Sequence, residues 1–468
     1  MKERISGLLV GICSLFSLSC APASLVEMDT PSTVVDPSVI ATRSGALQLY
    51  RQAVGVFSIA YGGSGVEETF GGHVLISGLF ADEMMYGTSW GLVAWGVDER
   101  ILEDFSRVNG IYQRSRVAAQ QGREALRRYY PDGSQALQGR LQSLEAYMIL
   151  FMAEVYCSGV PLTQVPLVGS PTLTRGFSTS ELFEHALVRF DSAIALSVDS
   201  TRFVHLARVG KARTLLNLGR FEEARAVART VPQDFRYEVE YGLPEFQLNP
   251  IGRDARVVQI VDRKGENGLI WSPDPRVAVR VLPDIPGGMR VTAKYSRTSA
   301  GTLDPTISAP ATPIRLADGL EARLIEAEAD LALGQASWLS ILQGLRTACI
   351  GTAPCAPLPE LSSTNLPADA LIDPGTPEER LNLLMQERAM WLFATGHRQG
   401  DLRRMVKLYH RSAAALWPKG AYTHPGLPSD YSPVSTSGIP YGDRYVFDYG
   451  PDGDNPLYKG CSSMDPNS

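Results

Sequence analysis

The sequence predicts a mainly α-helical protein in which paired helices carry a loop-rich region with a few short strands. Apolar residues recur every three to four positions through most of 41–231 and again through 314–415, which is the spacing of amphipathic helices. Between these stretches, residues 232–313 are rich in proline and glycine and contain short β-like runs. Hydrophobic residues make up 44% of the 468-residue chain, which is enough to bury a large core.

The chain begins with a segment that has the properties of an export signal. Two basic residues precede Ile5–Leu18, an apolar run of 14 residues, whereas a membrane-spanning helix needs ~20. The end of this segment resembles a bacterial lipobox, so we expect residues 1–20 to be a signal peptide and Cys20 to carry a lipid. Residues 21–40 would then be a spacer, and the lipid would hold the protein on a membrane. Simple secretion and an uncleaved anchor are the alternatives.

Cysteine usage fits an exported protein. If Cys20 is lipidated, the body of the protein keeps Cys157, Cys349, Cys355 and Cys461. An even number favours disulfides in that compartment. Cys349 and Cys355 flank a short turn and are the easiest pair to close, and Cys157 with Cys461 would then tie the C-terminal tail to the helices. Free buried thiols are the alternative, and no cysteine spacing indicates a metal site.

The N-terminal helical part covers 41–231. Residues 136–156 are apolar over most of the helix circumference, which predicts a central buried helix. Ser178 and Glu181 fit a capping box and mark the start of another helix. The helices expected in this part cover 41–61, 73–85, 97–130, 136–156, 182–196, 203–218 and 221–231.

Two segments resemble tetratricopeptide helical hairpins. Residues 212–224 combine small alanines, where two helices would touch, with Gly219 as a left-handed cap between them. The second hairpin is expected over 324–334 and 338–347. Because the two hairpins do not repeat at a regular period, we do not expect a simple solenoid.

The C-terminal helical part covers 314–415. Thr376 and Glu379, with a proline between them, favour a helix start, and we expect that helix to run to Ala394. Residues 416–468 form a loop-rich tail whose tyrosines and cysteine predict packing on the body. The further elements expected are a helix from Arg315, a helix over 401–415, and strands at 255–261, 277–282 and 290–295.

Four segments carry recognisable motifs. The first is Cys20, and the second is a long helix that runs into Gly159-Val-Pro-Leu162. The third is Arg323-Leu-Ile-Glu-Ala-Glu-Ala329. The fourth and most specific runs from Gln386-Glu-Arg388 through Gly396-His-Arg398 to Asp401-Leu-Arg403-Arg404. In this order, the four segments resemble the SusD/RagB family of outer-membrane nutrient-binding lipoproteins.

The resemblance implies a single SusD-like domain over 41–468 and a role in nutrient uptake. It implies a lipid-anchored protein on the outer membrane, facing the cell exterior, that binds an oligosaccharide or other polymer fragment. It further implies that the ligand is handed to a TonB-dependent, SusC-like β-barrel transporter. The alternatives are a tetratricopeptide-like periplasmic scaffold that binds another protein, and a secreted hydrolase with an unrecognised site.

The charges of the fourth motif lie beside an apolar stripe. We therefore expect a paired network that fixes the joint between two helices, made of Glu387, Arg388, His397, Arg398, Asp401, Arg403 and Arg404. Asp82 and Glu83 are adjacent carboxylates, which project about 100° apart on a helix and so suit acid–base work poorly. We expect them at a solvated helix end.

Exposed aromatic side chains are the expected ligand contacts, because ring faces match the C–H patches of sugars. These residues are Tyr86, Trp90 and Trp95 in a glycine-rich loop, with Trp271, Tyr441 and Tyr445 as lesser candidates. The alternative is that these rings are buried against neighbouring helices.

Charge and motif content exclude several functions. The chain has 44 basic and 50 acidic residues, a net charge of −6, and no run of five basic residues, which argues against nucleic-acid binding. No H-E-x-x-H or paired metal spacing is present in the sequence, and we predict no enzyme, no metal and no cofactor.

Overall fold

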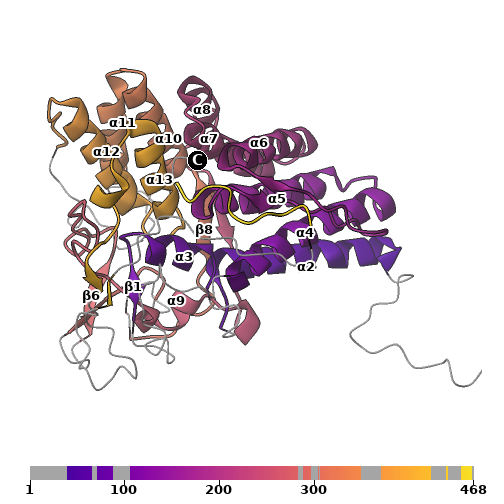
Figure 1. The fold of residues 1–468 in the computed structure, drawn as a ribbon. Coiled ribbons are helices and arrows are strands. Elements are labelled where there is room, and N and C mark those ends of the chain that lie inside the picture. Colours follow the sequence, from indigo (N-terminus) through magenta and orange to yellow (C-terminus); the bar gives the residue numbers. More distant parts are fainter. Residues whose placement is uncertain are drawn as a thin grey trace, which may run out of the picture.

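In a computed structural model of the chain, helices α2, α4, α5, α6 and α7 pack side by side in the order of the sequence (Figure 1). Helix α10 then packs on α7 and α8, and α11 and α12 pack on α10. The prediction of a mainly α-helical fold is confirmed. The structure describes residues 40–65, 71–87, 106–282, 288–296, 304, 306–348, 370–422, 439–440 and 455–465.

The helices follow the predicted ranges closely. They are α2 (Arg43–Gly62), α3 (His73–Phe80), α4 (Ser106–Tyr129), α5 (Gln135–Val155), α6 (Thr179–Leu196), α7 (Thr201–Asn217), α8 (Phe221–Ala228), α9 (Pro250–Arg253), α10 (Gly319–Ala332), α11 (Ser337–Ala348), α12 (Pro377–Trp391) and α13 (Arg398–Tyr409). Short 3₁₀ turns are η5 (Glu245–Gln247), η6 (Ala255–Val257) and η7 (Ala413–Ala415).

Helix α5 is the centre of the largest hydrophobic core. Every residue from Leu141 to Val155 is buried, because α4 lies on one side of the helix and α6 and α7 lie on the other. This confirms the predicted central buried helix. A smaller cluster joins α10, α11 and α12 around Leu324, Trp338 and Leu384.

The predicted helix starts have the expected caps. The Ser178 hydroxyl accepts a hydrogen bond from the Glu181 N–H at 3.2 Å, and the Glu181 carboxylate accepts one from the Ser178 N–H at 2.8 Å. The Thr376 hydroxyl likewise accepts from the Glu379 N–H at 3.2 Å, with Pro377 in the first turn of α12.

Both predicted helical hairpins are present. Helices α7 and α8 are joined at Gly219, which has a φ of 74°, and α10 and α11 are joined at Gly334, which has a φ of 69°. Glycine adopts this left-handed conformation without the strain that a side chain adds, so each hairpin can turn tightly.

The strands are short and pair two by two, always antiparallel. They are β1 (Met85–Tyr86) with β5 (Val258–Gln259), β2 (Val160–Pro161) with β3 (Gly176–Phe177), β4 (Arg236–Val239) with β8 (Ile314–Asp318), β6 (Val279–Leu282) with β7 (Met289–Thr292), and β9 (Ala421–Tyr422) with β10 (Ile439–Pro440). Strands β6 and β7 confirm the runs expected at 277–282 and 290–295, and the run expected at 255–261 contains η6 and β5.

The boundaries of several predicted helices were wrong. The helix expected over 73–85 ends at Phe80, and Met85 lies in β1. Arg315 lies in β8 and not in a helix, because Tyr237 and its neighbours in β4 pair with this segment and delay the start of α10 to Gly319. Helix α12 ends at Trp391 and not at Ala394, which has a φ of 55°. The helix expected over 401–415 begins and ends earlier, as α13, and is followed by η7.

The C-terminal segment is tied to the end of α5. A disulfide joins Cys157 to Cys461, with the Cα atoms 5.8 Å apart, which is the pairing expected to hold the tail. The Ser462 N–H donates to the Ser158 carbonyl at 2.8 Å beside this disulfide. Cys349 and Cys355 lie outside the described residues.

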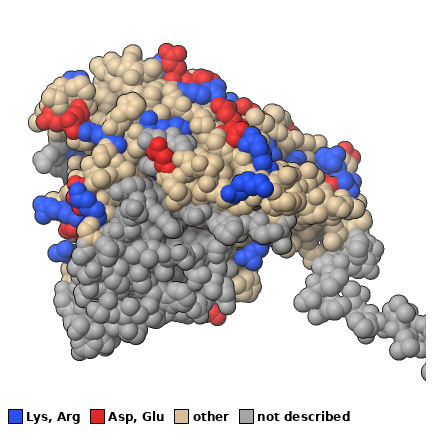
Figure 2. All heavy atoms as spheres, viewed as in Figure 1, with Lys and Arg blue, Asp and Glu red and all other residues tan. Residues whose placement is uncertain are grey.

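Acidic and basic side chains are mixed on the surface. On the face drawn in Figure 2, lysines and arginines alternate with aspartates and glutamates over the described helices, without a broad basic area. This agrees with the small net charge. Among the described residues, no helix combines the length and apolar character needed to cross a membrane.

Candidate functional site

The most specific sequence motif forms the turn between α12 and α13, residues 392–397. The turn is buried, and its backbone is held by side chains from distant parts of the chain. His73 Nε2 lies 2.8 Å from the Gly396 carbonyl, and Arg213 donates to the same carbonyl at 2.9 Å. Further bonds run from Tyr61 and Tyr295 to the carbonyls of Thr395 and Ala394, from Lys294 to the Phe393 carbonyl, and from the Ala394 N–H to Glu83.

Buried ion pairs hold α13 in place. Arg404 donates twice to Glu328, at 2.5 and 2.8 Å, and once to Asp401 at 2.7 Å, and Arg388 donates to Asp401 at 2.9 Å. Burial alone would raise the pKa of Asp401, but Arg388 and Arg404 outweigh it and hold this pKa well below its usual range. The expected structural network is confirmed, since its charges are paired and enclosed.

Three other members of the network also have buried partners. Glu387 accepts from Arg276 at 2.9 Å and from Arg346 at 2.5 Å. Arg403 donates to the carbonyls of Ala153 and Tyr156, at 2.5 and 3.0 Å. His397 Nε2 lies 3.0 Å from Glu321 Oε1. The motif therefore fixes the frame of the protein and does not face a ligand.

Glu321 and Glu83 are kept neutral near pH 7. Burial raises the pKa of each carboxyl group to about 8. Burial also lowers the pKa of His397 well below its usual value, so that its imidazole stays neutral beside protonated Glu321.

Asp82 and Glu83 do not form a solvated helix end, and that expectation was wrong. Both side chains are fully enclosed in the described structure. Arg398 donates to both carboxylate oxygens of Asp82, and Glu83 accepts from the Ala394 N–H at 3.0 Å. Their partners come from the other end of the chain, so local sequence could not place them.

The expectation that Trp271 is an exposed ligand contact was also wrong. Its side chain is fully buried, and its indole N–H donates to the Asp82 carbonyl at 3.1 Å. The Arg398 guanidinium lies 5.6 Å from the indole centroid, and the Phe393 ring also lies 5.6 Å from it. Trp271 therefore cannot offer a ring face to a ligand, and it packs under the α12–α13 turn.

The remaining predicted contacts are not placed by the structure. Tyr86 belongs to β1, where its backbone pairs with Val258, but its side chain is not described. The residues Cys20, Trp90, Trp95, Tyr441 and Tyr445 lie outside the described residues and stay predictions.

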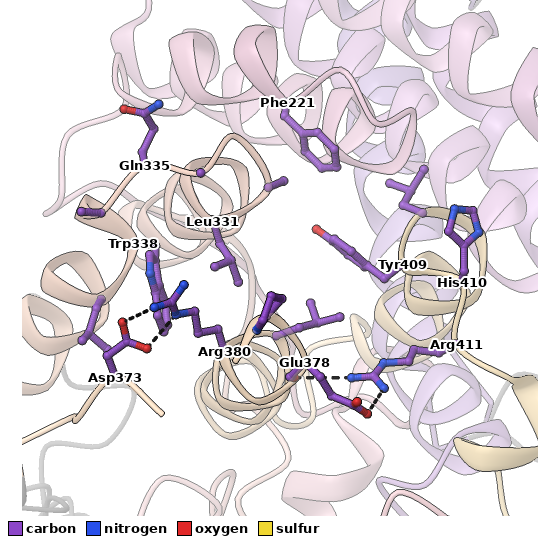
Figure 3. Close-up of a pocket in the computed structure, with 17 residues that line it drawn as sticks. Phe221, Leu331, Gln335, Trp338, Asp373, Glu378, Arg380, Tyr409, His410 and Arg411 are labelled. Carbon is purple, nitrogen blue, oxygen red and sulfur yellow. Dashed lines mark hydrogen bonds and ion pairs between the residues drawn. The ribbon is translucent and has the colours of Figure 1, made fainter. Parts of the chain in front are cut away.

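A groove lies between the two helical hairpins and the start of α12, and we call it the hairpin groove (Figure 3). Its volume is about 870 Å³, which is within the ~300–1,000 Å³ of small-molecule sites. Its wall is formed by the start of α8, the end of α10 with the start of α11, and the end of α13. The labelled lining residues are Phe221, Leu331, Gln335, Trp338, Asp373, Glu378, Arg380, Tyr409, His410 and Arg411.

Aromatic rings form the apolar wall of the hairpin groove. The rings of Phe221 and Tyr409 have centroids 6.4 Å apart and planes 29° apart, and both are partly exposed. The Tyr409 hydroxyl donates to Glu328 at 3.1 Å, which ties this ring to the buried network. Trp338 is almost fully buried and supports the opposite wall.

Two ion pairs form the polar rim of the hairpin groove. Arg380 donates to both carboxylate oxygens of Asp373, at 2.7 and 2.8 Å. Arg411 donates to Glu378 and, at 3.0 Å, to Asn382. The hydrogen bond from Arg380 lowers the pKa of Asp373, so this carboxylate stays ionised.

The hairpin groove could not be predicted from the sequence. The helix start at Thr376 and the hairpin turn at Gly219 were both predicted, but each was assigned to local structure. Their juxtaposition depends on how α8, α10 and α12 pack. Within the described ranges, no group of three or more histidine, cysteine, aspartate or glutamate side chains is arranged to hold a metal ion.

Comparisons with known proteins agree with this architecture. No protein-family model matches the chain, and no curated protein matches it in sequence. A SusD-like carbohydrate-binding protein from Bacteroides vulgatus aligns with a TM-score of 0.59 and 13% identity, over 91% of this chain and 97% of that one. A laminarin-binding SusD-like protein aligns with a TM-score of 0.58 and 13% identity, over 87% and 96%. NanU from B. fragilis aligns with a TM-score of 0.56 and 13% identity, over 91% and 99%. The chain therefore has the SusD-like fold.

Proposed function

We propose that the protein is a lipid-anchored receptor on the outer surface of an outer membrane, which binds a glycan or other polymer fragment. It hands this nutrient to a TonB-dependent, SusC-like β-barrel transporter. The observation that carries the proposal is the shared fold, which covers about nine-tenths of this chain and of relatives named for carbohydrate or laminarin binding. The lipobox-like end at Cys20 supports the anchor.

The mechanism we propose is binding without covalent chemistry. Among the described residues, the carboxyl groups whose pKa is raised to about 8, those of Glu83 and Glu321, are enclosed in the frame. The carboxylates of the hairpin groove, Asp373 and Glu378, are each held by an arginine. These features favour a receptor over a hydrolase.

The ligand contacts we propose are the aromatic residues predicted from the sequence, without Trp271: Tyr86, Trp90, Trp95, Tyr441 and Tyr445. Trp90 and Trp95 follow β1 in the sequence, and β1 pairs with β5. Aromatic rings suit sugar binding, because their faces match the C–H patches of a sugar.

A tetratricopeptide-like scaffold that binds another protein is the second candidate. The hairpins α7–α8 and α10–α11 favour it, since such pairs build protein-binding grooves. The aromatic wall and paired charges of the hairpin groove suit a sugar better than a flat protein surface.

Co-purification from membranes tests the proposal. The full-length protein is isolated in mild detergent from cells fed radiolabelled palmitate, beside a Cys20→Ser control. We expect the wild-type chain to carry the label and to bring a β-barrel transporter with it, and the Cys20→Ser chain to be unlabelled. Release of the wild-type chain in unlabelled form, with no barrel protein bound, would contradict the proposal.

A further inference from the structure

The hairpin groove is a rigid surface. Phe221 stands at the start of α8, and its neighbour Tyr409 is fixed by the hydrogen bond to Glu328, which lies within the ion-pair network of α13. Arg380 and Glu378 belong to the first turns of α12, whose start is capped by Thr376. The groove is therefore formed before any ligand arrives, which lowers the entropy cost of binding.

The charges of the groove indicate what kind of ligand it takes. Two arginines and two carboxylates line it, and each arginine is paired with a carboxylate, so the rim is neutral as a whole. A rim without net charge gives a charged ligand little electrostatic attraction. A ligand with neutral hydroxyl groups can use the remaining donors and acceptors of the planar guanidinium and carboxylate groups while the pairs stay intact.

The apolar wall completes the pattern. Phe221 and Tyr409 present partly exposed rings opposite the Arg380–Asp373 pair, with Leu331 between the two sides (Figure 3). Ring faces beside planar polar groups match the two kinds of surface of a pyranose, its C–H patches and its hydroxyl edges. The size of the groove, about 870 Å³, fits a short oligosaccharide segment.

We infer that the hairpin groove is a carbohydrate site that binds a neutral glycan segment through Phe221, Tyr409 and the Arg380–Asp373 pair. It is additional to the contacts proposed at Trp90 and Trp95, because the described residues that line the groove come from α8, α10, α11, α12, α13 and the segments beside them, and none of these described residues belongs to β1. This inference rests on the proposed function in one respect, namely that the ligand of the protein is a glycan. Two such sites would let one polymer chain be held at two points, which raises its retention by multivalency.

Hydrogen–deuterium exchange locates the site directly. The full-length protein in detergent micelles is mixed with neutral gluco-, xylo- and manno-oligosaccharides, and exchange is followed in peptides covering 331–339 and 373–381. We expect a bound oligosaccharide to slow exchange in both peptides, and to do so equally in a Trp90→Ala, Trp95→Ala variant. Binding is measured in parallel by calorimetry.

Matched variants give the energetic test. We expect Phe221→Ala to lower the affinity of the hairpin groove for the oligosaccharide by about fivefold, which is the order expected for one lost ring contact. The control is Phe246→Ala, because Phe246 is another accessible phenylalanine, on η5, and this change should leave the affinity unchanged. Arg380→Gln is expected to weaken it too, and Arg175→Gln, in an exposed pair with Glu181, is the matched control. Thermal unfolding of each variant checks that it is folded.

The outcomes separate this inference from the proposed function. If oligosaccharides bind and are lost with Trp90 and Trp95 while the groove peptides and groove variants show no response, the inference is wrong and the proposed function stands. If only charged peptides protect the groove, the inference is also wrong. If no oligosaccharide binds anywhere, the inference is wrong, and the co-purification experiment alone then decides the proposed function.

Discussion

The guanidinium of Arg398 donates to both carboxylate oxygens of Asp82, at 2.5 and 2.7 Å, across 316 positions of sequence. This pair joins the segment after α3 to the first residue of α13. Both side chains are buried, so the pair is shielded from water and from salt. It fixes one side of the α12–α13 turn.

Arg398→Met is expected to destabilise the protein strongly. It leaves the Asp82 carboxylate buried with only the Asn267 amide, at 2.7 Å, as a side-chain partner, and breaking such a pair costs about 3–5 kcal/mol. Urea unfolding measures the free energy. Arg175→Met, in an exposed pair with Glu181, is the control and should hardly move the midpoint. Equal shifts for the two variants would contradict the account.

Stability is expected to fall as the pH rises from 6.5 to 8. Glu83 and Glu321 keep their protons in the folded protein up to about pH 8, whereas the unfolded chain has already lost them. Each group can contribute a slope of roughly 1.4 kcal/mol per pH unit. His73 and His397 have lowered pKa values, so their contribution to stability rises with pH, mainly below about pH 6.5 where the unfolded chain binds their protons.

The variant Glu83→Gln isolates this effect. Glutamine keeps an acceptor for the Ala394 N–H but does not titrate, so the fall in unfolding free energy between pH 6.5 and 8 should become shallower. Denaturant unfolding at several pH values in this window measures both slopes. A wild-type stability that rises over the window, or an unchanged slope in the variant, is the contrary result.

Gly396→Ala is expected to cost more than the same change at Gly334. Both glycines have φ near 70°, which costs an alanine about 1–2 kcal/mol. A Cβ at Gly396 would lie 2.5 Å from Cδ2 of His73, whereas a Cβ at Gly334 would meet nothing within 4 Å. The difference between the two unfolding free energies therefore measures how firmly the α12–α13 turn is enclosed. Similar losses of unfolding free energy in the two variants would show that the turn shifts to make room for the Cβ, and would contradict this prediction.

Loss of the Cys157–Cys461 disulfide is expected to free the C-terminal segment. The bond closes a loop across 304 positions, and removing a native disulfide typically costs about 2–5 kcal/mol. In Cys461→Ser, hydrogen exchange should rise in residues 455–465 and the unfolding midpoint should fall. A Ser463→Ala variant keeps the bond and serves as control. Unchanged exchange in that segment would mean that its packing alone holds it.

Local signals in the sequence predicted the elements that local contacts determine. The capping box of Ser178, the start at Thr376 and the hairpin turns at Gly219 and Gly334 each depend on a few neighbouring residues, and each was placed correctly. The charged motif from Glu387 to Arg404 was interpreted correctly as structural for a similar reason, since its charges lie beside an apolar stripe.

Features that depend on distant partners could not be predicted in this way. Asp82 looked exposed because Arg398 is far away in sequence, and Trp271 looked available because the turn that covers it also comes from the C-terminal part. Strand β8 was missed because its partner β4 lies far away in sequence, at the beginning of the irregular insert. The hairpin groove forms only when α8, α10 and α12 meet, so no single segment carries its pattern.

Affinity electrophoresis of the full-length protein through native gels that contain neutral polysaccharides is the most direct test of the central claim, that this SusD-like frame displays aromatic residues to bind glycans. We predict that at least one polysaccharide retards the wild-type protein, and that Trp90→Ala with Trp95→Ala reduces the retardation while Phe246→Ala does not. Equal mobility with and without every polysaccharide tested would contradict the claim.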